Sequence, residues 1–296
     1  MATKKFNITF IGHMCYDEIV PFQGQTTVSP GSAVLCGAMV AGRVSQDIAI
    51  VTKMSPNDKS ILQPMKDIGI DTFLLPSEDT TYMRVEHPTE NVDIRQMYQF
   101  KNAGYITCNE LPEFESTFVH LAGITDQEFT FELIDELNKK GYSLSADMQS
   151  FVRQVDSETR QISFEDVPNK KELVSRLDRV KLDIVEAKIL TGLDDIEAAA
   201  IEIENWGSPE IVITQSEGVL ARVHGKTYYE KFSNKSIVGR TGRGDTTFAA
   251  YMSWRLDHDV AESLKFSAAL VSIKMESPGP FNASLEDVLE RVKQCH

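Results

Sequence analysis

The sequence predicts an α/β fold, in which a central, mostly parallel sheet is flanked by helices and a small β-flap lies beside it. Short apolar runs of strand length recur along the chain and alternate with longer segments of helical pattern. Such alternation favours parallel strands joined by helices that cover both faces of the sheet. Residues 79–103 instead alternate apolar and polar residues, which is typical of antiparallel strands. No linker divides the chain, so we expect residues 1–296 to form one domain.

Five short segments are predicted to be strands of the central sheet. The first leads into Gly12, the third into Gly123, and the fourth ends at Asp147. Polar residues that follow such strands lie at the carboxyl edge of a parallel sheet, where ligand sites commonly form. The five segments are residues 8–11, 48–51, 118–121, 142–146 and 211–214.

Helices and the flap complete the predicted fold. The flap is expected to combine residues 79–103 with residues 16–23, which also contain a strand-like run. A flap that closes over a site would exclude water from it, whereas the alternative is a surface hairpin without such a role. The helical stretches are predicted at residues 32–42, 128–139 and 170–179.

Composition narrows the function classes. The chain has 44 acidic and 30 basic residues and a formal net charge of −14, so it is a poor candidate for binding nucleic-acid backbones. No run of about 18 apolar residues is present, so no membrane span is expected. The N-terminus lacks the apolar stretch of a signal peptide, and the cysteines form no C-x-x-C pair. We therefore expect a cytoplasmic protein with free thiols.

The most informative segment is residues 239–252. Gly242 and Gly244 flank one residue, Asp245 follows at once, and an apolar, helix-compatible run comes next. Glycines let several backbone N–H groups turn toward one point, and the N-terminus of the following helix adds partial positive charge. The segment therefore predicts an anion hole. A carboxylate at its rim is suited to take a proton from an alcohol that attacks a bound phosphate; the alternative is that Asp245 only caps the helix.

Two common nucleotide-binding loops do not explain this pattern. The Walker A motif does not occur, because Leu220 stands where the glycine five positions before Gly225 would be needed. The dinucleotide motif G-x-G-x-x-G fails at Thr247. The sequence thus disfavours a nicotinamide dehydrogenase.

Residues 239–245, with the helix after them, resemble the C-terminal signature D-T-x-G-A-G-D of the PfkB/ribokinase family of ATP-dependent sugar and nucleoside kinases. The resemblance implies a ribokinase-like three-layer sandwich in which the β-flap serves as a lid. It implies that Asp245 is the catalytic base. It also implies that the N–H groups of Gly242, Arg243 and Gly244 form the anion hole for the γ-phosphate.

Two N-terminal segments match further motifs of the family in the right order. Gly12 and Asp17 follow a strand, and a helix of small residues follows Pro30 and Gly31. The resemblance implies that Asp17 and Gly31 bind the substrate. Pro30 replaces one glycine of the family's pair, and Leu35 stands where many members carry a substrate-binding Asn.

Two C-terminal segments continue the resemblance. Asp183 and Glu186 are similar to the family's N-x-x-E segment, which implies that they organise magnesium indirectly, through water. The segment that begins at Thr214 is similar to the nucleotide turn T-x-G-x-x-G, which implies nucleotide binding by Thr214, Ser216 and Gly218. Asp183 replaces an Asn, Ser216 replaces a glycine, and Gly218 comes one position early.

The segment after Asp147 indicates the substrate. Asp147, Gln149 and Arg153 resemble the D-x-Q-x-x-x-R segment of the myo-inositol kinase branch. The resemblance implies that Gln149 and Arg153 reach the acceptor or the phosphate, and it favours a cyclitol. The alternative is an ordinary strand-to-loop turn in which Arg153 pairs with Asp156.

The signature departs from the family at three positions. Gly239 and Arg240 replace the opening Asp-Thr, and Arg243 replaces the alanine. The Arg243 side chain either adds a cation near the phosphates or points to solvent. Because Asp245 is kept, we predict an active enzyme, and an inactive member that binds a sugar or nucleotide is the alternative.

We therefore predict a carbohydrate kinase that transfers the γ-phosphate of ATP to an alcohol of a small sugar or polyol, such as myo-inositol. A nucleoside kinase of the same family is the alternative. The resemblance implies ATP and Mg²⁺ as cofactors, with a monovalent cation as a further candidate. The expected partners are the small-molecule substrate and ATP, without nucleic acid or membrane, and the resemblance also implies a homodimer that pairs through the lid.

Overall fold

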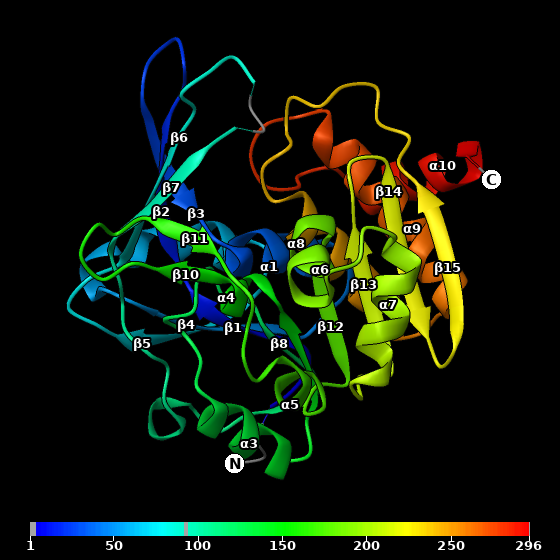
Figure 1. The fold of residues 1–296 in the computed structure, drawn as a ribbon, viewed down its shortest axis with the longest axis horizontal. Coiled ribbons are helices and arrows are strands. Elements are labelled where there is room, and N and C mark those ends of the chain that lie inside the picture. The colour runs from blue at the N-terminus through cyan, green and yellow to red at the C-terminus, as the bar shows by residue number, and fades with distance from the viewer. Residues whose placement is uncertain (1–3, 92–93, 296) are drawn as a thin grey trace.

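The structure is a computed structural model that describes residues 4–91 and 94–295. Over these residues, its centre is a nine-stranded sheet in the order β15-β14-β13-β12-β9-β8-β1-β4-β5 (Figure 1). The strands from β13 to β5 run parallel, and β14 and β15 add an antiparallel hairpin at one edge. The strands are β1 (Lys5–His13), β4 (Ile48–Met54), β5 (Asp71–Pro76), β8 (Glu115–Leu121), β9 (Ser143–Asp147), β12 (Arg179–Asp183), β13 (Glu210–Thr214), β14 (Gly218–Val223) and β15 (Lys226–Lys231).

Alternate side chains of the central strands enter two separate cores. In β4, Ile48 and Ile50 belong to the core on one face, and Ala49 and Val51 belong to the core on the other. Successive side chains of a strand point to opposite faces, and a sheet covered on both faces needs apolar residues at every position. The apolar runs of the sequence are thereby explained, and the sheet is the middle layer of a sandwich.

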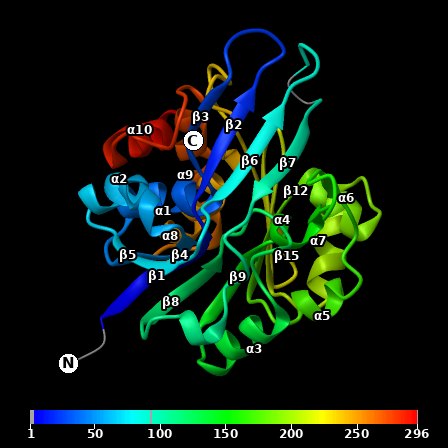
Figure 2. The same cartoon turned by 90° about the vertical axis from the view of Figure 1, so that its left-hand side faces the viewer.

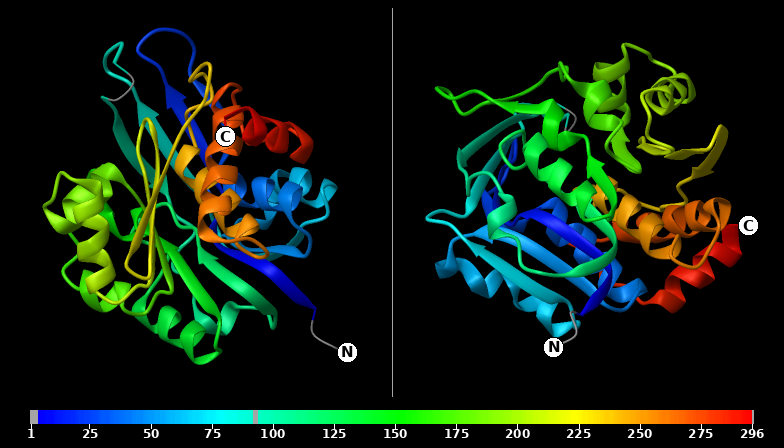
Figure 3. Two further views of the ribbon diagram at one scale, coloured as in Figure 1. Left: turned by 90° about the vertical axis from the view of Figure 1, so that its right-hand side faces the viewer. Right: turned by 90° about the horizontal axis from the view of Figure 1, so that it is seen from below.

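Helices cover both faces of the sheet (Figures 2 and 3). One layer consists of α1 (Ala33–Val44), α2 (Gln63–Asp67), α8 (Arg243–Trp254), α9 (Val260–Met275) and α10 (Leu285–Cys295). The other layer consists of α3 (Phe131–Lys139), α5 (Lys170–Val174), α6 (Ile184–Thr191) and α7 (Ile196–Asn205). The short helix α4 (Gln149–Val152) follows β9, and 3₁₀ turns lie at Pro56–Leu62 and Cys108–Glu110. This is the predicted α/β sandwich.

A second sheet, which we call the lid, projects from the sandwich (Figure 2). It has the order β3-β2-β6-β7, with β2 and β6 parallel and the outer pairs antiparallel. Its inner side packs on the sandwich through a small apolar cluster of Cys15, Met83, Met97, Ile124 and Ile162. The strands are β2 (Cys15–Val20), β3 (Thr27–Gly31), β6 (Thr81–Glu86) and β7 (Gln96–Lys101).

The lid confirms the expected flap but corrects its bounds. β2 ends at Val20 rather than at residue 23, and β3 was not expected to be a strand. Apart from Gly31, the residues of β3 are exposed, so the segment lacks the alternation of apolar and polar residues that marks a half-buried strand. Residues 92–93 of the predicted flap lie outside the described residues.

Two predicted helices are shorter in the structure than expected. The helix predicted from residue 128 begins at Phe131, because the Thr130 side chain accepts a hydrogen bond from the Leu133 N–H and caps it. The helix predicted to reach residue 179 ends at Val174, and Arg179 opens strand β12. A hairpin of β10 (Arg153–Val155) and β11 (Ile162–Phe164), which we did not predict, lies between the sandwich and the lid.

A membrane-spanning helix is not found among the described residues, since none of their helices combines the required length and apolar character.

Candidate active site

The N-terminus of α8 is the candidate anion site. Gly242 is the residue before the helix and has a φ of 75°, a left-handed conformation that favours glycine. The first helical bond runs from the Thr246 N–H to the Gly242 carbonyl, at 3.0 Å. The N–H groups of the first helical residues therefore have no acceptor within the helix. That of Arg243 donates to the Arg240 carbonyl at 3.2 Å, so the candidate hole shifts toward the N–H groups of Gly244 and Asp245.

Lys181 adds a buried cation beside this helix end. A Cβ placed on Gly244 would lie 2.8 Å from the Lys181 Nζ, so the glycine permits this close approach. Nζ lies 2.7 Å from the Oδ2 of Asp147 and 3.9 Å from the Oδ1 of Asp245. Burial alone would lower the pKa of Lys181, but the surrounding carboxylates, including Glu186, outweigh it and raise the pKa. Lys181 therefore stays charged next to the anion site.

Asp245 lies at the rim of the site. Its side chain is 17% exposed, so the carboxylate can meet a ligand while it faces Lys181. Gly242 and not Asp245 occupies the N-cap position, and no side-chain bond caps the helix. Helix capping therefore does not account for Asp245, and proton transfer remains its candidate role.

Asp17 lies across the site, on lid strand β2. Burial raises its pKa, and the Asp245 carboxylate adds to this, whereas the Cys15 thiol and Arg153 counteract it. The Arg153 and Asp245 charges therefore lie near enough to Asp17 to influence its carboxylate. A Cβ on Gly31 would lie 1.9 Å from the Oδ2 of Asp17, so the backbone of β3 lies directly against this carboxylate.

Arg153 lies near both Glu186 and Asp17. Its Nη2 lies 3.9 Å from the Oε1 of Glu186, and its Nε is buried without a partner among the described residues. Asp156 instead holds the turn that follows, by accepting from the N–H groups of Glu158 and Thr159. Arg153 is therefore not the partner of Asp156, and its guanidinium group retains donors for a ligand.

Gln149 follows the carboxyl end of β9, and its side-chain amide is hydrogen-bonded within the protein. Its Nε2 donates to the Gly123 carbonyl at 2.7 Å, and its N–H donates to the Oδ1 of Asp147 at 3.1 Å. The amide thereby holds two strand ends together. Its predicted contact with the substrate is untested.

Asp183 and Glu186 form a capping box at the start of α6. Asp183 accepts from the N–H groups of Val185 and Glu186, and the Oε2 of Glu186 accepts from the Asp183 N–H, each at 2.8 Å. The other oxygen of Glu186 is buried without a hydrogen-bond donor. Burial, reinforced by Asp183, raises the pKa of Glu186 to about 6 despite Lys181 and Arg153.

These carboxylates fit an indirect magnesium site. Within residues 4–91 and 94–295, no group of three or more His, Cys, Asp or Glu side chains could hold a metal ion alone. A magnesium ion commonly keeps several waters and takes the rest of its ligands from a phosphate substrate. The orphaned oxygen of Glu186 suits such a bound water.

The predicted nucleotide turn is a hairpin between β13 and β14. The Gln215 N–H donates to the Gly218 carbonyl at 3.0 Å, and Ser216 is exposed at the tip. Gly218 is covered by the next strand, since a Cβ on it would lie 2.6 Å from the Tyr229 hydroxyl. Thr214 alone lies near the anion site, 3.7 Å from a Cβ built on Gly244.

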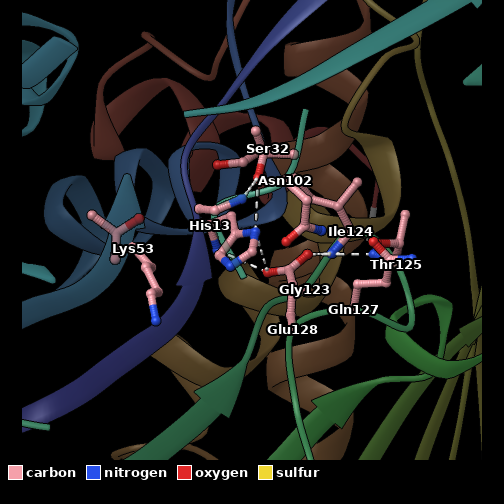
Figure 4. Close-up of polar contacts among 12 residues, drawn as sticks. His13, Ser32, Lys53, Asn102, Gly123, Ile124, Thr125, Gln127 and Glu128 are labelled. Atoms are coloured by element: carbon pink, nitrogen blue, oxygen red, sulfur yellow. Dashed lines mark hydrogen bonds and ion pairs between the residues drawn. The ribbon is translucent and has the colours of Figure 1, made fainter. Parts of the chain in front are cut away.

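A buried polar cluster joins the end of β1, the loop before α3 and the lid (Figure 4). Glu128 accepts from the backbone N–H groups of His13, Ile124 and Thr125 at 2.8, 2.5 and 3.3 Å. The ring of His13 bonds Thr81 of β6 through Nδ1 and the Gly104 carbonyl through Nε2, at 2.9 Å each. The end of β1, the loop before α3 and the lid therefore meet at one point.

A model of the pfkB family of carbohydrate kinases matches residues 5–287. The chain belongs to this family. It has the ribokinase-like fold, and membership identifies it as a carbohydrate kinase. The resemblance drawn from the signature around Asp245 is confirmed.

Three relatives show how this family member compares with known kinases. A pyrophosphate-dependent kinase of the ribokinase family, solved with sulfate, is 31% identical over 96% of this chain and 99% of its own, with a TM-score of 0.88. A pyrophosphate-dependent kinase solved with a pyrophosphate analogue and myo-inositol is 30% identical over 96% and 99%, with a TM-score of 0.86. A cytidine kinase of Thermococcus kodakarensis is 25% identical over 258 residues, 83% of this chain and 87% of that protein.

Two buried lysines at this candidate site were not predicted from the sequence: Lys181 faces Asp245, and Lys274 binds the loop that precedes α8. Lys181 lies in a buried strand and Lys274 in a buried helix, where a charged residue is unusual without a partner. An isolated lysine within an apolar segment was the available signal. Its partners lie far away in the sequence, so the signal could not be interpreted from the segment alone.

Proposed function

We propose that this kinase transfers a phosphoryl group from pyrophosphate to a hydroxyl group of a cyclitol or a similar polyol. The observation that carries the proposal is the arrangement around the N-terminus of α8. Asp17 lies on the lid side, Asp245 lies at the helix, and the buried Lys181 lies beside the glycine turn. A polyol held by Asp17 would present a hydroxyl to Asp245, opposite a phosphate held by the helix end.

The chemistry requires little from the protein beyond positions and charges. Asp245 takes the proton of the hydroxyl, and the hydroxyl oxygen bonds to phosphorus while the bond to the leaving phosphate breaks. The N–H groups of Gly244 and Asp245, together with Lys181, stabilise the charge on the transferred group. Magnesium, when bound, neutralises the donor, and Glu186 and Asp183 would hold its waters.

The acceptor proposal rests on Arg153 and on similarity. Arg153 directs a partly unsatisfied guanidinium group between Asp17 and Glu186. A polyol offers several hydroxyl groups that can pair with a carboxylate on one side and a guanidinium group on the other. The kinase solved with myo-inositol shares 30% of its residues with this chain over nearly the full length, which supports a cyclitol.

Charge in the phosphate loop supports pyrophosphate as the donor in place of ATP. Pyrophosphate has no base or ribose, so its affinity must come from cations. The loop contains Arg240 and Arg243 where the family signature has uncharged residues, and Lys181 lies beside it. The two solved relatives described above are pyrophosphate-dependent. ATP, which the sequence had led us to expect, is the alternative donor.

A matrix of donors and acceptors tests the proposal. Myo-inositol, a pentose, a hexose and cytidine are each incubated with pyrophosphate or ATP and Mg²⁺, and ³¹P NMR detects the phosphate monoester. We expect a cyclitol monoester with pyrophosphate and none with Asp245→Asn. A cyclitol product with ATP alone would overturn the donor assignment. Product from cytidine alone would favour the nucleoside kinase, to which the cytidine kinase similarity points.

A further inference from the structure

Lys274 is a buried cation that the proposed chemistry does not use. It is the penultimate residue of α9, and only 3% of it is exposed. Its Nζ donates to the carbonyl oxygens of Gly239 and Thr241, which precede the glycine turn of α8. The ammonium group therefore lies beneath the loop that leads into the anion site.

The backbone at the end of α9 makes a further contact with the loop that contains Gly239. The Gly239 N–H donates to the Met275 carbonyl at 2.8 Å. A Cβ on Gly239 would lie 1.8 Å from the Ser277 carbonyl oxygen and 2.6 Å from that of Lys274, so the loop lies directly on the last carbonyls of the helix. The Lys274 carbonyl belongs to the last turn of α9 and carries part of the negative charge of the helix C-terminus, whereas Ser277 follows the C-cap residue. The carbonyls of Gly239 and Thr241, which both accept from the Lys274 Nζ, mark a position suited to a cation.

The titratable neighbours of Lys274 come from two other helices. Burial lowers its pKa, whereas Cys36 of α1 and Asp245 of α8 raise it. Cys36 also lies against the glycine turn, since a Cβ built on Gly242 would lie 2.6 Å from the Cys36 sulfur. Lys274 thus interacts electrostatically with the catalytic carboxylate across the loop.

We propose that the Lys274 ammonium group is a built-in cation of the phosphate loop, which makes a monovalent metal ion unnecessary. It is a positioning residue. By binding the carbonyls of Gly239 and Thr241, it turns them toward α9, and the chain then enters α8 with its N–H groups directed at the anion. Its charge also offsets the carbonyl dipoles that would otherwise repel a phosphate. The effect on turnover rests on the proposed function, whereas the effect on cation binding does not.

The first test varies the salt. Activity of the wild-type protein is measured in chlorides of potassium, sodium, ammonium and tetramethylammonium at equal ionic strength. We expect rates that agree within about twofold, because the ammonium group is covalently present. A wild-type protein that needs potassium or sodium for turnover would overturn the proposal.

The second test removes the ammonium group of Lys274 by substitution. Lys274→Ala is expected to lose about 10- to 100-fold in turnover in tetramethylammonium chloride, from the loss of two charged hydrogen bonds. Potassium, ammonium or methylammonium ions should restore a large part of the loss. Lys274→Met fills the space without charge and should not be rescued. Lys265→Ala, at a half-buried position of the same helix, is the control and should show no cation dependence.

Thermal unfolding without substrate separates this proposal from the proposed function. Lys274→Ala should melt at a higher temperature in potassium chloride than in tetramethylammonium chloride, whereas the wild type should melt alike in both. If no acceptor is turned over by any variant, the proposed function fails and the melting difference still tests the cation position. A Lys274→Ala protein for which no cation restores either melting temperature or turnover would overturn the proposal.

Discussion

The interior of the sandwich and the attachment of the lid to the sandwich depend on different kinds of contact. At the end of the sandwich, Lys181, Asp147 and Asp245 form a buried cluster of charges between two extensive cores. The lid packs on the sandwich through a small apolar cluster and through the hydrogen bond between the His13 ring and Thr81, while Glu128 holds the backbone of His13. Interiors with dense packing are rigid, and elements with few apolar contacts open most easily. Under the proposed function, phosphoryl transfer takes place at the densely packed sandwich, and the lid contributes Asp17 to acceptor recognition.

The largest effect should come from the rigid part. Asp245→Asn removes the base but keeps the size of the side chain, so turnover should fall by about 10²- to 10⁴-fold while donor affinity changes little. Steady-state rates and calorimetric titration with pyrophosphate check both parts. Asp257→Asn, at an exposed position beyond the end of α8, should behave as wild type. Equal turnover in wild type and Asp245→Asn would assign proton transfer elsewhere.

The buried polar cluster around Glu128 should contribute to the free energy of unfolding. Glu128→Ala leaves three buried N–H groups without their acceptor, so the free energy of unfolding should fall by about 3 kcal/mol or more. Chemical denaturation measures this change. The exposed Glu158→Ala should stay within about 0.5 kcal/mol of wild type. A loss in Glu128→Ala no larger than this would mean that Glu128 does not stabilise the junction of β1 and the loop before α3, against which the lid packs.

Substitution on the lid should affect acceptor binding and spare the donor. Asp17→Asn should lower kcat/KM for the polyol by about 10- to 100-fold, because a charged hydrogen bond is weakened. The KM for pyrophosphate should stay near its wild-type value. Kinetics with each substrate varied in turn separate the two constants. An equal rise in both KM values would contradict the division between lid and sandwich.

The smallest effect concerns the pH dependence of stability. The pKa of Glu186 is raised to about 6 from 4.5, so the folded state favours its protonated form. The stability that this provides is complete below pH 4.5 and is lost as the pH rises through about 6, a change of about 2 kcal/mol. The Gln side chain does not titrate. As the pH rises from 4.5 to about 6, the free energy of unfolding of Glu186→Gln should therefore increase by about 2 kcal/mol relative to that of wild type. Denaturation curves of both proteins measure this difference in stability across the pH range. A difference that does not change with pH would contradict the raised pKa of Glu186.

The sequence predicted what is local and missed what depends on register. The strands of the sandwich and the signature around Asp245 are recognisable because their pattern lies within a few residues. Lys181 gains its role because it lies opposite Asp147 in the parallel pairing of β12 with β9, 34 residues away, and beneath α8. Such contacts across strands leave no trace in the segment itself.

The lid shows the same limit in another form. In the segment of β3, the sequence predicted only substrate binding by Gly31, because the segment contains Pro30 and lacks the alternation of apolar and polar residues. Its identity as a strand follows from pairing with β2, which places Gly31 against Asp17. Pairing of two lids into a homodimer stays a prediction.

A crystal structure with a polyol and a non-hydrolysable pyrophosphate analogue tests the central claim most directly. We predict a phosphate at the N–H groups of Gly244 and Asp245, beside Lys181. A hydroxyl of the polyol should lie about 2.6–3.2 Å from the Asp245 carboxylate, with Asp17 bound to other hydroxyl groups. A phosphate bound away from the N-terminus of α8, or a polyol beyond the reach of Asp245, would contradict the account.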